Sequence, residues 1–340
     1  MATRTSAARR LPSWQSRPER RRPRLARMTW RKHDGAPASE PDLIDPSSPA
    51  WVHTAMHTAI GLARHGASLV VTARDAGRAQ KAVDRITVDA PGAEVDVVSL
   101  DLADLADAKR AAKDVSAAYD RIDILVNNAG IMIPPKLTLT ADGFELQMGT
   151  NHLGHFAWTA GLWPLLVASN SRVVTVSSMA HTSVGSIDLD ALTPAGSSRK
   201  YQRWQTYGES KLANLMFALE LDRRAKAAGL GVVSVPAHPG YASTNLTKTG
   251  PTVNGLSLPG IGMHQITKII GQPASHGAWP LLMAATDPTL TGGEYVGPAG
   301  FRGMRGRPKL VGMSRVARDE ELADQLWVAS ESAAGVVFDV

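Results

Sequence analysis

The chain has 340 residues, of which 44% are hydrophobic and 20% are charged, and this composition is typical of a soluble globular protein. It contains no cysteine, which excludes disulfides, thiolate-bound zinc and a cysteine nucleophile, and which fits a reducing compartment such as the cytoplasm. No apolar run approaches the roughly 18 residues that a membrane-spanning helix needs.

The positive charge is concentrated at the N-terminus. Residues 1–33 hold ten Arg, one Lys and one Glu, a net charge of +10, whereas the whole chain carries +6, so the remainder is near −4. We expect residues 1–50 to form a basic, disordered tail ahead of one domain over residues 51–340. An Arg-rich tail can lack a function, direct a chain to mitochondria or bind polyanions, and all three alternatives stay open. The remainder has no basic stripe, so no nucleic-acid partner is expected there.

From residue 56 onward, helical patterns alternate with short apolar runs. Apolar runs of four to eight residues are typical of buried strands, and alternation with helices predicts a parallel sheet that is covered on both faces. The fold class predicted is therefore a Rossmann-type, doubly wound α/β domain. The expected helices are 56–66, 76–87, 104–118, 141–168 and a long one from about Tyr207 to Ala228; the expected strands are 67–72, 94–100, 122–126, 172–176 and 231–235.

Ligands of such sheets bind beyond the carboxyl ends of the strands, so the residues that follow each strand are candidates. Arg74 follows the first strand, where an arginine accommodates the 2′-phosphate of NADP, although an ordinary solvated arginine fits as well. Asp101 and Leu102 follow the second strand, and the Asp101 carboxylate either accepts a hydrogen bond from an adenine amino group or caps the next helix.

Later strand ends carry further polar residues. Asn127-Asn-Ala-Gly130 follows the third strand, Ser177-Ser178 the fourth, and His238-Pro239-Gly240 the fifth. Asn and Gly suit a tight turn that brings the backbone close to a ligand, and serine hydroxyls can hydrogen-bond a carbonyl oxygen. Each of these motifs, taken alone, also fits an ordinary polar loop.

Tyr207 and Lys211 are four residues apart at the head of the long helix, so they lie on one face. A free phenol has a pKa of about 10. A neighbouring ammonium stabilises the phenolate and lowers this pKa, which would suit Tyr207 to general acid/base catalysis.

In order and spacing, Asn127-Asn-Ala-Gly130, Asn151, Ser178, Tyr207-x-x-x-Lys211 and Pro239-Gly240 with Thr244 resemble the short-chain dehydrogenase/reductase family. The segments 151–156 and 172–181 are most similar to its retinol dehydrogenase and protochlorophyllide reductase branch. This resemblance implies a nicotinamide-dependent oxidoreductase that uses NADP(H), with NAD(H) possible.

The resemblance also implies roles for individual residues. Tyr207 would exchange a proton with the substrate oxygen, Lys211 would lower its pKa and hold the nicotinamide ribose, Ser178 would polarise the substrate oxygen, and Asn151 would anchor a water. The expected cofactor-binding residues are Arg74, Asp101, Leu102, Asn127, Ala129, Gly130, Tyr207, Lys211, Pro239, Gly240 and Thr244. Residues 250–263 fall where the family has a substrate lid, and no metal is needed, so we interpret His152 and His155 as ordinary helix residues.

The chain departs from the family at its start. The family opens with a buried strand and a Thr-Gly-x-x-x-Gly-x-Gly turn that binds the cofactor pyrophosphate. Counted back from Gly66, its glycines should fall near positions 49, 53 and 55, where this chain has Pro49, His53 and Ala55. The prolines of residues 42–49 cannot donate to a sheet ladder, so we also expect the first strand of the family to be missing from the chain as written. Our hypothesis is a reading-frame or gene-start error upstream of about residue 56, which fails if no alternative frame encodes the turn.

The leading prediction is an NADP(H)-preferring oxidoreductase that acts on a small, lipophilic carbonyl or alcohol. The main alternative is a non-catalytic relative that has lost dinucleotide binding, because the glycine-rich turn is missing. A third is a polyanion-binding protein that acts through residues 1–33. A homodimer or homotetramer in the cytoplasm, with no membrane span, completes the expectation, and the sequence does not specify the substrate.

Overall fold

The computed structural model describes residues 50–194, 200–240 and 273–340. The predicted tail, the predicted lid at 250–263 and Thr244 lie outside these residues. No helix within the described ranges is long and apolar enough to cross a membrane. The named helices and strands are α1 Ala50–Arg64, β1 Leu69–Ala73, α2 Ala76–Asp89, β2 Val95–Ser99, α3 Leu105–Ala118, β3 Ile124–Asn127, α4 Leu146–Met148, η2 Gly149–Leu153, α5 Gly154–Ser169, β4 Arg172–Val176, η3 Met179–Ser183, η4 Leu189–Leu192, α6 Arg203–Ala227, β5 Val233–Ala237, α8 Ala274–Thr286, β6 Val296–Pro298, η6 Phe301–Gly303, β7 Pro308–Leu310, η7 Val316–Arg318 and α9 Glu320–Ala334.

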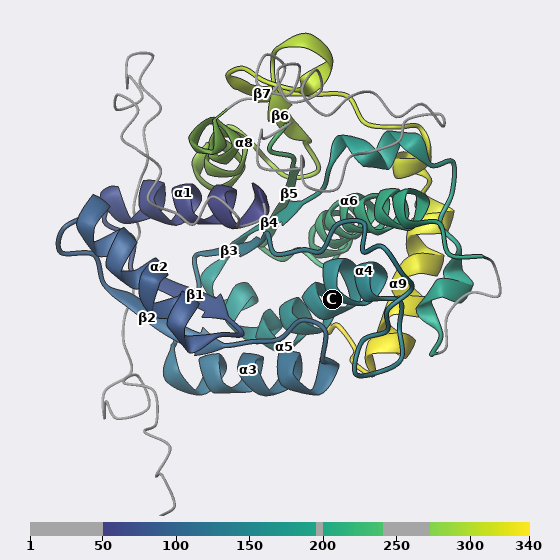
Figure 1. Cartoon of the computed structure of the whole chain (residues 1–340), viewed down its shortest axis with the longest axis horizontal. Coiled ribbons are helices and arrows are strands. Elements are labelled where there is room, and N and C mark those ends of the chain that lie inside the picture. The colour runs from purple at the N-terminus through teal and green to yellow at the C-terminus, as the bar shows by residue number, and fades with distance from the viewer. Residues whose placement is uncertain (1–49, 195–199, 241–272) are drawn as a thin grey trace, which may run out of the picture.

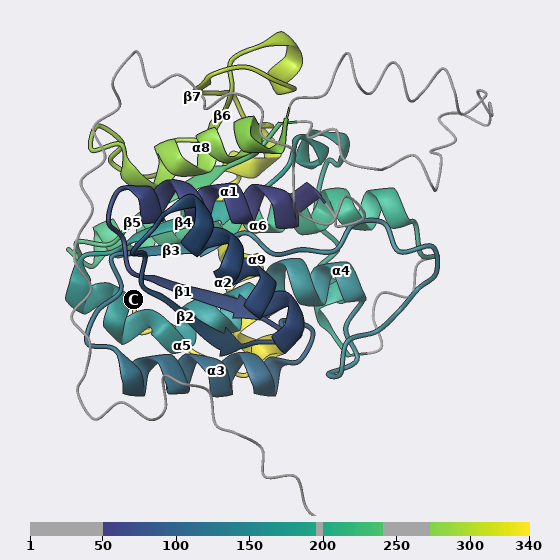
Figure 2. The ribbon, with the colours of Figure 1, turned by 60° about the vertical axis from the view of Figure 1, so that its left-hand side comes forward.

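The α/β fold class is confirmed, and the sheet lies between two helical layers. Helices α1 and α8 lie side by side on one face, and α3, α5 and α6 lie on the other (Figures 1 and 2). Strands β1 to β6 run parallel to their neighbours wherever they pair, and the last strand, β7, is antiparallel to β6. The carboxyl ends of the parallel strands therefore point to one edge, where the predicted site residues follow them.

The described residues lack the first strand of the family, as the prolines upstream of residue 50 predict, and the sheet is therefore in two parts. They form a two-stranded sheet, β1-β2, and a five-stranded sheet, β3-β4-β5-β6-β7, and no described strand joins β1 to β3. The side chains of Leu69 on β1 and Ile124 on β3 nevertheless pack against the same apolar cluster of Leu62, Ala278 and Leu282. The two sheets are thus neighbours under α1 and α8, and their facing edges lack a described hydrogen-bonding partner.

Strand β1 is also less buried than the prediction of a sheet covered on both faces requires. Its residues alternate between half-buried and exposed, and the Val70 side chain is 38% exposed. In the five-stranded sheet, by contrast, Val173, Val174 and Val235 are buried completely. The interior of the domain is therefore built around β4 and β5 rather than around β1.

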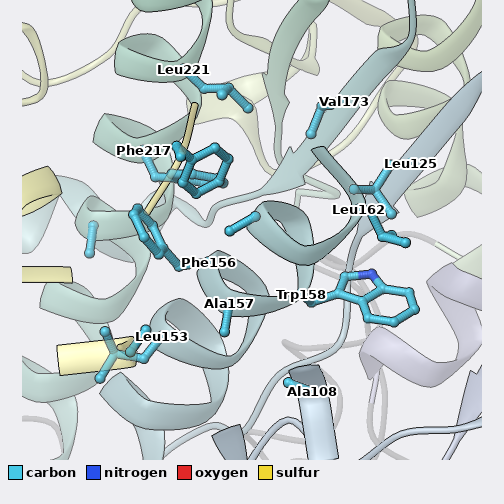
Figure 3. Packing of buried hydrophobic residues seen from close by; sticks show 14 of the residues in the cluster. Ala108, Leu125, Leu153, Phe156, Ala157, Trp158, Leu162, Val173, Phe217 and Leu221 are labelled. Carbon is cyan, nitrogen blue, oxygen red and sulfur yellow. The ribbon is translucent and has the colours of Figure 1, made fainter. Parts of the chain in front are cut away.

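Helices α5 and α6 form the centre of the largest apolar cluster, which Figure 3 shows. Phe156 of α5 and Phe217 of α6 lie with their ring centroids 5.4 Å apart, and Trp327 of α9 stacks on Phe217 at 5.8 Å. Nearly every residue of α6 from Gly208 to Leu221 is buried, so this helix is held rigidly. Rigid packing of α6 fixes the direction in which Tyr207 and Lys211 leave it.

Three boundaries differ from the prediction for local reasons. Helix α1 begins at Ala50 rather than at residue 56, because no glycine or turn interrupts the stretch in between. The helix expected from residue 141 begins only at Leu146, because Glu145 accepts hydrogen bonds from the backbone N–H groups of Gln147 and Met148 and caps it. Strand β5 ends at Ala237, two residues later than expected, so His238 follows it directly.

Candidate active site

Tyr207 lies in the second turn of α6, and the side chain of Ser178, which follows β4, interacts with its phenol and favours the ionised form. Ser178 also caps the short helix η3, since its Oγ accepts a hydrogen bond from the backbone N–H of Ala180 at 3.2 Å. The sequence separates these two hydroxyls by 29 positions, and the fold brings them together. A phenol and an alcohol that lie this near each other can both hydrogen-bond one oxygen of a ligand.

Lys211 is buried one turn after Tyr207. Its Nζ donates a hydrogen bond to the backbone oxygen of Val176 at 3.2 Å, and the side-chain amide of Asn214 donates to the same oxygen at 3.1 Å. The end of β4 is thereby fixed to α6 by two side chains, of which sequence reasoning identified only Lys211. The spacing of three residues between Lys211 and Asn214 is the signal that would have found the second.

The pKa of Tyr207 differs from the sequence prediction, in which the ammonium of Lys211 lowers it. Burial raises the pKa of Tyr207, and the hydrogen bond with Ser178 opposes this increase. Burial also lowers the pKa of Lys211 to about 8. The Lys211 ammonium is 6.0 Å from the centre of the Tyr207 ring. In the protein alone, burial therefore outweighs the expected lowering of the phenol pKa by the ammonium.

Asn151 is fully buried in η2, a single π-helical turn between α4 and α5. Its amide oxygen accepts from the backbone N–H of Ile131 at 2.7 Å, and its amide nitrogen donates to Ile131 O and to Ser210 Oγ, each at 2.9 Å. Asn151 thus ties the loop after β3 to helix α6. Isolated π-helical turns are frequent at functional sites, and this one places the amide beside the loop.

Gly130 shows how tightly these groups converge. A Cβ atom at this position would lie 3.0 Å from Asn151 Oδ1 and 3.5 Å from Lys211 Nζ. A side chain there would crowd the amide and the ammonium that the resemblance assigns to the site. Asn151, Ser178, Tyr207 and Lys211, the predicted catalytic residues, are therefore brought to one corner at the carboxyl ends of β3 and β4.

The predicted cofactor-binding residues divide into two groups. At the adenosine end, Arg74 and Asp101 come together, with Arg74 Nη1 3.7 Å from Asp101 Oδ2, and both side chains are accessible to solvent. Asp101 also accepts from the backbone N–H of Ala103, so it caps the following turn as well. Leu102 is buried in the main core.

Among the residues predicted to lie near the nicotinamide, some follow a strand end as expected and one faces the core instead. The side-chain amide of Asn127 is buried and donates to Thr159 Oγ1 at 2.9 Å, so it faces helix α5 and supports the loop from inside. Ala129 is half-buried against the main core. Pro239 and Gly240 follow β5, and Gly240 adopts the left-handed backbone with φ of 74° that favours glycine.

The described residues fit a nicotinamide cofactor at its nicotinamide end better than at its pyrophosphate. Gly130 has no room for a side chain beside the buried ammonium of Lys211, and this arrangement fits the close approach of a nicotinamide ribose. Where the family has its glycine-rich turn, however, His53 and Ala55 are part of the regular helix α1. An uninterrupted helix presents no loop of free N–H groups at these positions.

His152 and His155 are buried in the helix that carries Asn151, as expected for helix residues, and the described residues contain no group suited to hold a metal. Burial lowers the pKa of His152 to about 3 and that of His155 to about 4. His238, beside Gly240, is lowered to about 4, again mainly by burial. All three are therefore neutral near pH 7.

These histidines predict that the protein loses stability in mild acid. In the unfolded chain they bind protons with a pKa of about 6.5, whereas in the folded protein they do not until much lower pH, so stability falls as pH drops below 6.5. Each contributes about 1.4 kcal/mol per pH unit in that window. Glu145 and Asp222, whose pKa values are raised mainly by burial, offset part of the loss.

Urea unfolding at pH 7, 6 and 5 measures this effect. We expect a steep loss of unfolding free energy, and the His152→Gln variant should show a slope that is shallower by about 1.4 kcal/mol per pH unit. Equal stability at pH 7 and pH 5 would show that the histidines are protonated in the folded protein or solvated.

Comparison with known proteins agrees with this geometry. A family model described as short chain dehydrogenase matches residues 55–188, so the match begins inside α1, at the last of the three positions where the glycines are missing. The chain is 35% identical to human retinol dehydrogenase 13 over 286 residues, which cover 82% of this chain and 80% of that protein. It is 36% identical to mouse polyprenol dehydrogenase over 275 residues, 79% of this chain and 77% of that protein.

A solved structure of an uncharacterized protein from Mycobacterium Paratuberculosis is similar over most of the domain. It has 39% sequence identity and a TM-score of 0.68, and the match covers 85% of this chain and 91% of that chain. The similarity to these proteins and the arrangement of Tyr207, Lys211, Ser178 and Asn151 lead to one conclusion: the chain belongs to the short-chain dehydrogenase/reductase family of nicotinamide-dependent oxidoreductases.

Proposed function

We propose that this protein is an NADP(H)-preferring oxidoreductase that interconverts a carbonyl and an alcohol on a small, lipophilic substrate. The observation that carries the proposal is the interaction of the Ser178 side chain with the Tyr207 phenol beside the buried Lys211. Relatives named for retinol and polyprenol, both lipophilic alcohols, support the substrate class.

The chemistry of the pair follows from its geometry. The nicotinamide, when bound, supplies or accepts the hydride. Ser178 donates a hydrogen bond to the substrate oxygen and orients it toward the phenol. Tyr207 delivers a proton to that oxygen during reduction and removes it during oxidation, as a general acid and base. Because burial raises its pKa, Tyr207 is protonated at neutral pH and is ready to act as the acid.

Lys211 and Asn151 support this proton transfer. The Lys211 side chain crosses from α6 to the end of β4 and places a cation near the phenol, which favours the phenolate that forms when the proton leaves. Asn151 holds the Ile131 peptide, which follows Gly130, through two hydrogen bonds. In this proposal, the Lys211 ammonium also binds the nicotinamide ribose and Asn151 anchors a water.

Arg74 supports the preference for NADP(H), and its removal tests that preference. The guanidinium is exposed beyond the end of β1 and is paired at 3.7 Å with Asp101, so it is available to a 2′-phosphate. In the Arg74→Ala variant we expect the affinity for NADPH to fall about 10- to 100-fold, the loss of one charge-assisted hydrogen bond, with NADH affinity nearly unchanged.

Isothermal titration calorimetry with both cofactors measures this change. The matched control is Arg78→Ala, which removes an exposed arginine from the following helix, α2, and should leave both affinities unchanged. Equal losses of NADPH and NADH affinity in Arg74→Ala, or no loss of either, would identify Arg74 as an ordinary solvated residue.

The alternative function is a non-catalytic binding protein. The regular helix at His53 and Ala55, where the family has its glycine-rich turn, favours this alternative, because the pyrophosphate finds no cradle among the described residues. The complete set of Asn151, Ser178, Tyr207 and Lys211 favours the oxidoreductase. Polyanion binding by residues 1–33, the domain boundary near residue 50, a homodimer or homotetramer and a cytoplasmic location stay predictions.

A further inference from the structure

His181 occupies an enclosed position directly behind the catalytic serine. It lies in η3, three residues after Ser178, and only 2% of it is exposed to solvent. Its ring Nδ1 is 2.6 Å from the backbone oxygen of Ser178. A carbonyl oxygen can only accept, so Nδ1 carries the hydrogen and donates it.

The other ring nitrogen of His181 faces a different part of the chain. The backbone N–H of Ser314, in the loop between β7 and η7, donates to Nε2 at 3.3 Å. An N–H can only donate, so Nε2 carries the lone pair. The two contacts together require one neutral tautomer of the imidazole, with the hydrogen on Nδ1.

Aromatic and titratable groups enclose the ring. Tyr295, just before β6, packs edge-on against His181 with centroids 5.5 Å apart, and His238, after β5, lies 5.2 Å from the same tyrosine. Tyr207 is the third titratable group near this cluster, through its interaction with Tyr295. Burial in these surroundings lowers the pKa of His181, and the contact to Ser178 opposes the decrease.

The hydrogen bonds of His181 act on the residue that faces Tyr207. The Ser178 carbonyl accepts from the ring of His181 and also from its backbone N–H at 3.1 Å. The Ser178 hydroxyl accepts from the backbone N–H of Ala180 and interacts with the Tyr207 phenol. The carbonyl and the hydroxyl of Ser178 are therefore both held by residues of η3. A change in its peptide plane would move the hydroxyl relative to the phenol.

We propose that His181 is a positioning residue for the reaction, which holds Ser178 against Tyr207 by bridging the Ser178 carbonyl to the backbone of Ser314. The proposal rests on the proposed oxidoreductase function. The loop between β7 and η7, which carries Ser314, would then help to position the Ser178 hydroxyl.

Two substitutions separate this role from simple packing. His181→Phe keeps a planar ring against Tyr295 but loses both hydrogen bonds. His181→Asn places an amide N–H near the former Nδ1, so it can still donate to Ser178. We expect kcat to fall about 10- to 100-fold in His181→Phe, the size of effect that small misplacements of catalytic groups produce, and KM to change little.

His181→Asn should restore kcat to within about threefold of the original, because the donated hydrogen bond to Ser178 is kept. The control is His65→Gln, an exposed histidine whose ring Nδ1 is hydrogen-bonded to the nearby carbonyl of Gly61. A pure packing role predicts the opposite order, with Phe tolerated and Asn damaging. That order, or equal kcat in all three variants, would overturn the proposal.

A second readout does not depend on turnover. The chain has five tyrosines, so 13Cζ labelling gives a small set of phenol resonances in which that of Tyr207 is assigned by Tyr207→Phe. We expect its shift at pH 7.5 to change in His181→Phe and to be kept in His181→Asn. If the protein shows no turnover but this pattern appears, the proposed function fails and the positioning holds; if the resonance does not respond, the positioning is wrong.

Acid pH provides a further check. Protonated imidazole has hydrogens on both nitrogens, so Nε2–H would face Ser314 N–H and the bridge would break. We expect kcat to decrease as pH falls through the lowered pKa of His181, and His181→Asn to lack this decrease. If kcat decreases in the same way at acid pH in the original protein and in His181→Asn, the bridge through His181 is contradicted.

Discussion

Replacing Tyr207 by phenylalanine should lower kcat by about 10²- to 10⁴-fold, the contribution that a positioned general acid or base makes. The substitution removes only the hydroxyl, with which the Ser178 side chain interacts. The ring stays in place on α6, so the fold and the affinity for the cofactor should change little. Steady-state kinetics with NADPH and a panel of lipophilic aldehydes measures the loss.

Tyr201→Phe is the matched control, because it removes a hydroxyl from the same region without touching the proposed chemistry. The Tyr201 hydroxyl donates to the backbone oxygen of Pro134 at 2.9 Å, and its loss should cost about 1 kcal/mol of stability and little rate. If Tyr207→Phe and Tyr201→Phe lose similar amounts of activity, Tyr207 is not the proton donor and the mechanism is wrong.

The open edge of β1 should exchange its amide hydrogens at least about 100-fold faster than the centre of the five-stranded sheet. The backbone N–H of Leu69 and the oxygen of Ala73 are bonded toward β2. Because successive residues of a strand face opposite neighbours, Val70 and Thr72 direct their N–H groups away from β2, where no described strand pairs with them. Val173 and Val174 of β4 lie between two paired strands.

Hydrogen exchange followed by NMR resolves these amides one by one. The internal control is the difference between Val70 and Val71, which are adjacent in the sequence but should differ in protection, since Val71 faces β2. Equal protection of Val70, Val71 and Val174 would mean that another segment of the chain pairs with β1 and completes the sheet. Such a result would also reopen the question of how the pyrophosphate is held.

Much of the architecture could be predicted because its physical signals are local. Apolar runs placed β1, β2, β3 and β4 within two or three residues, and the spacing of Tyr207 and Lys211 on one helix face was correct. The residues after successive parallel strands converge because all strands point the same way. Strand direction alone therefore brought Ser178 and Gly130 to one edge.

Other features depend on contacts that a sequence pattern does not contain. The missing first strand could be predicted from the prolines upstream of residue 50, but the raised pKa of Tyr207 follows from burial by segments distant in sequence. The inward turn of Asn127 depends on a hydroxyl 32 residues away on α5. The bridge through His181 depends on Ser314, which is 133 residues away.

The most direct test of the account is calorimetric titration of the purified, folded chain with NADPH and with NADH. The account predicts one site per chain that binds NADPH at least about tenfold more tightly than NADH, the difference that one charge-assisted hydrogen bond from Arg74 supplies. Circular dichroism on the same sample establishes that the chain is folded. A folded chain that binds neither cofactor would contradict the account and would support a non-catalytic protein that has lost its dinucleotide site.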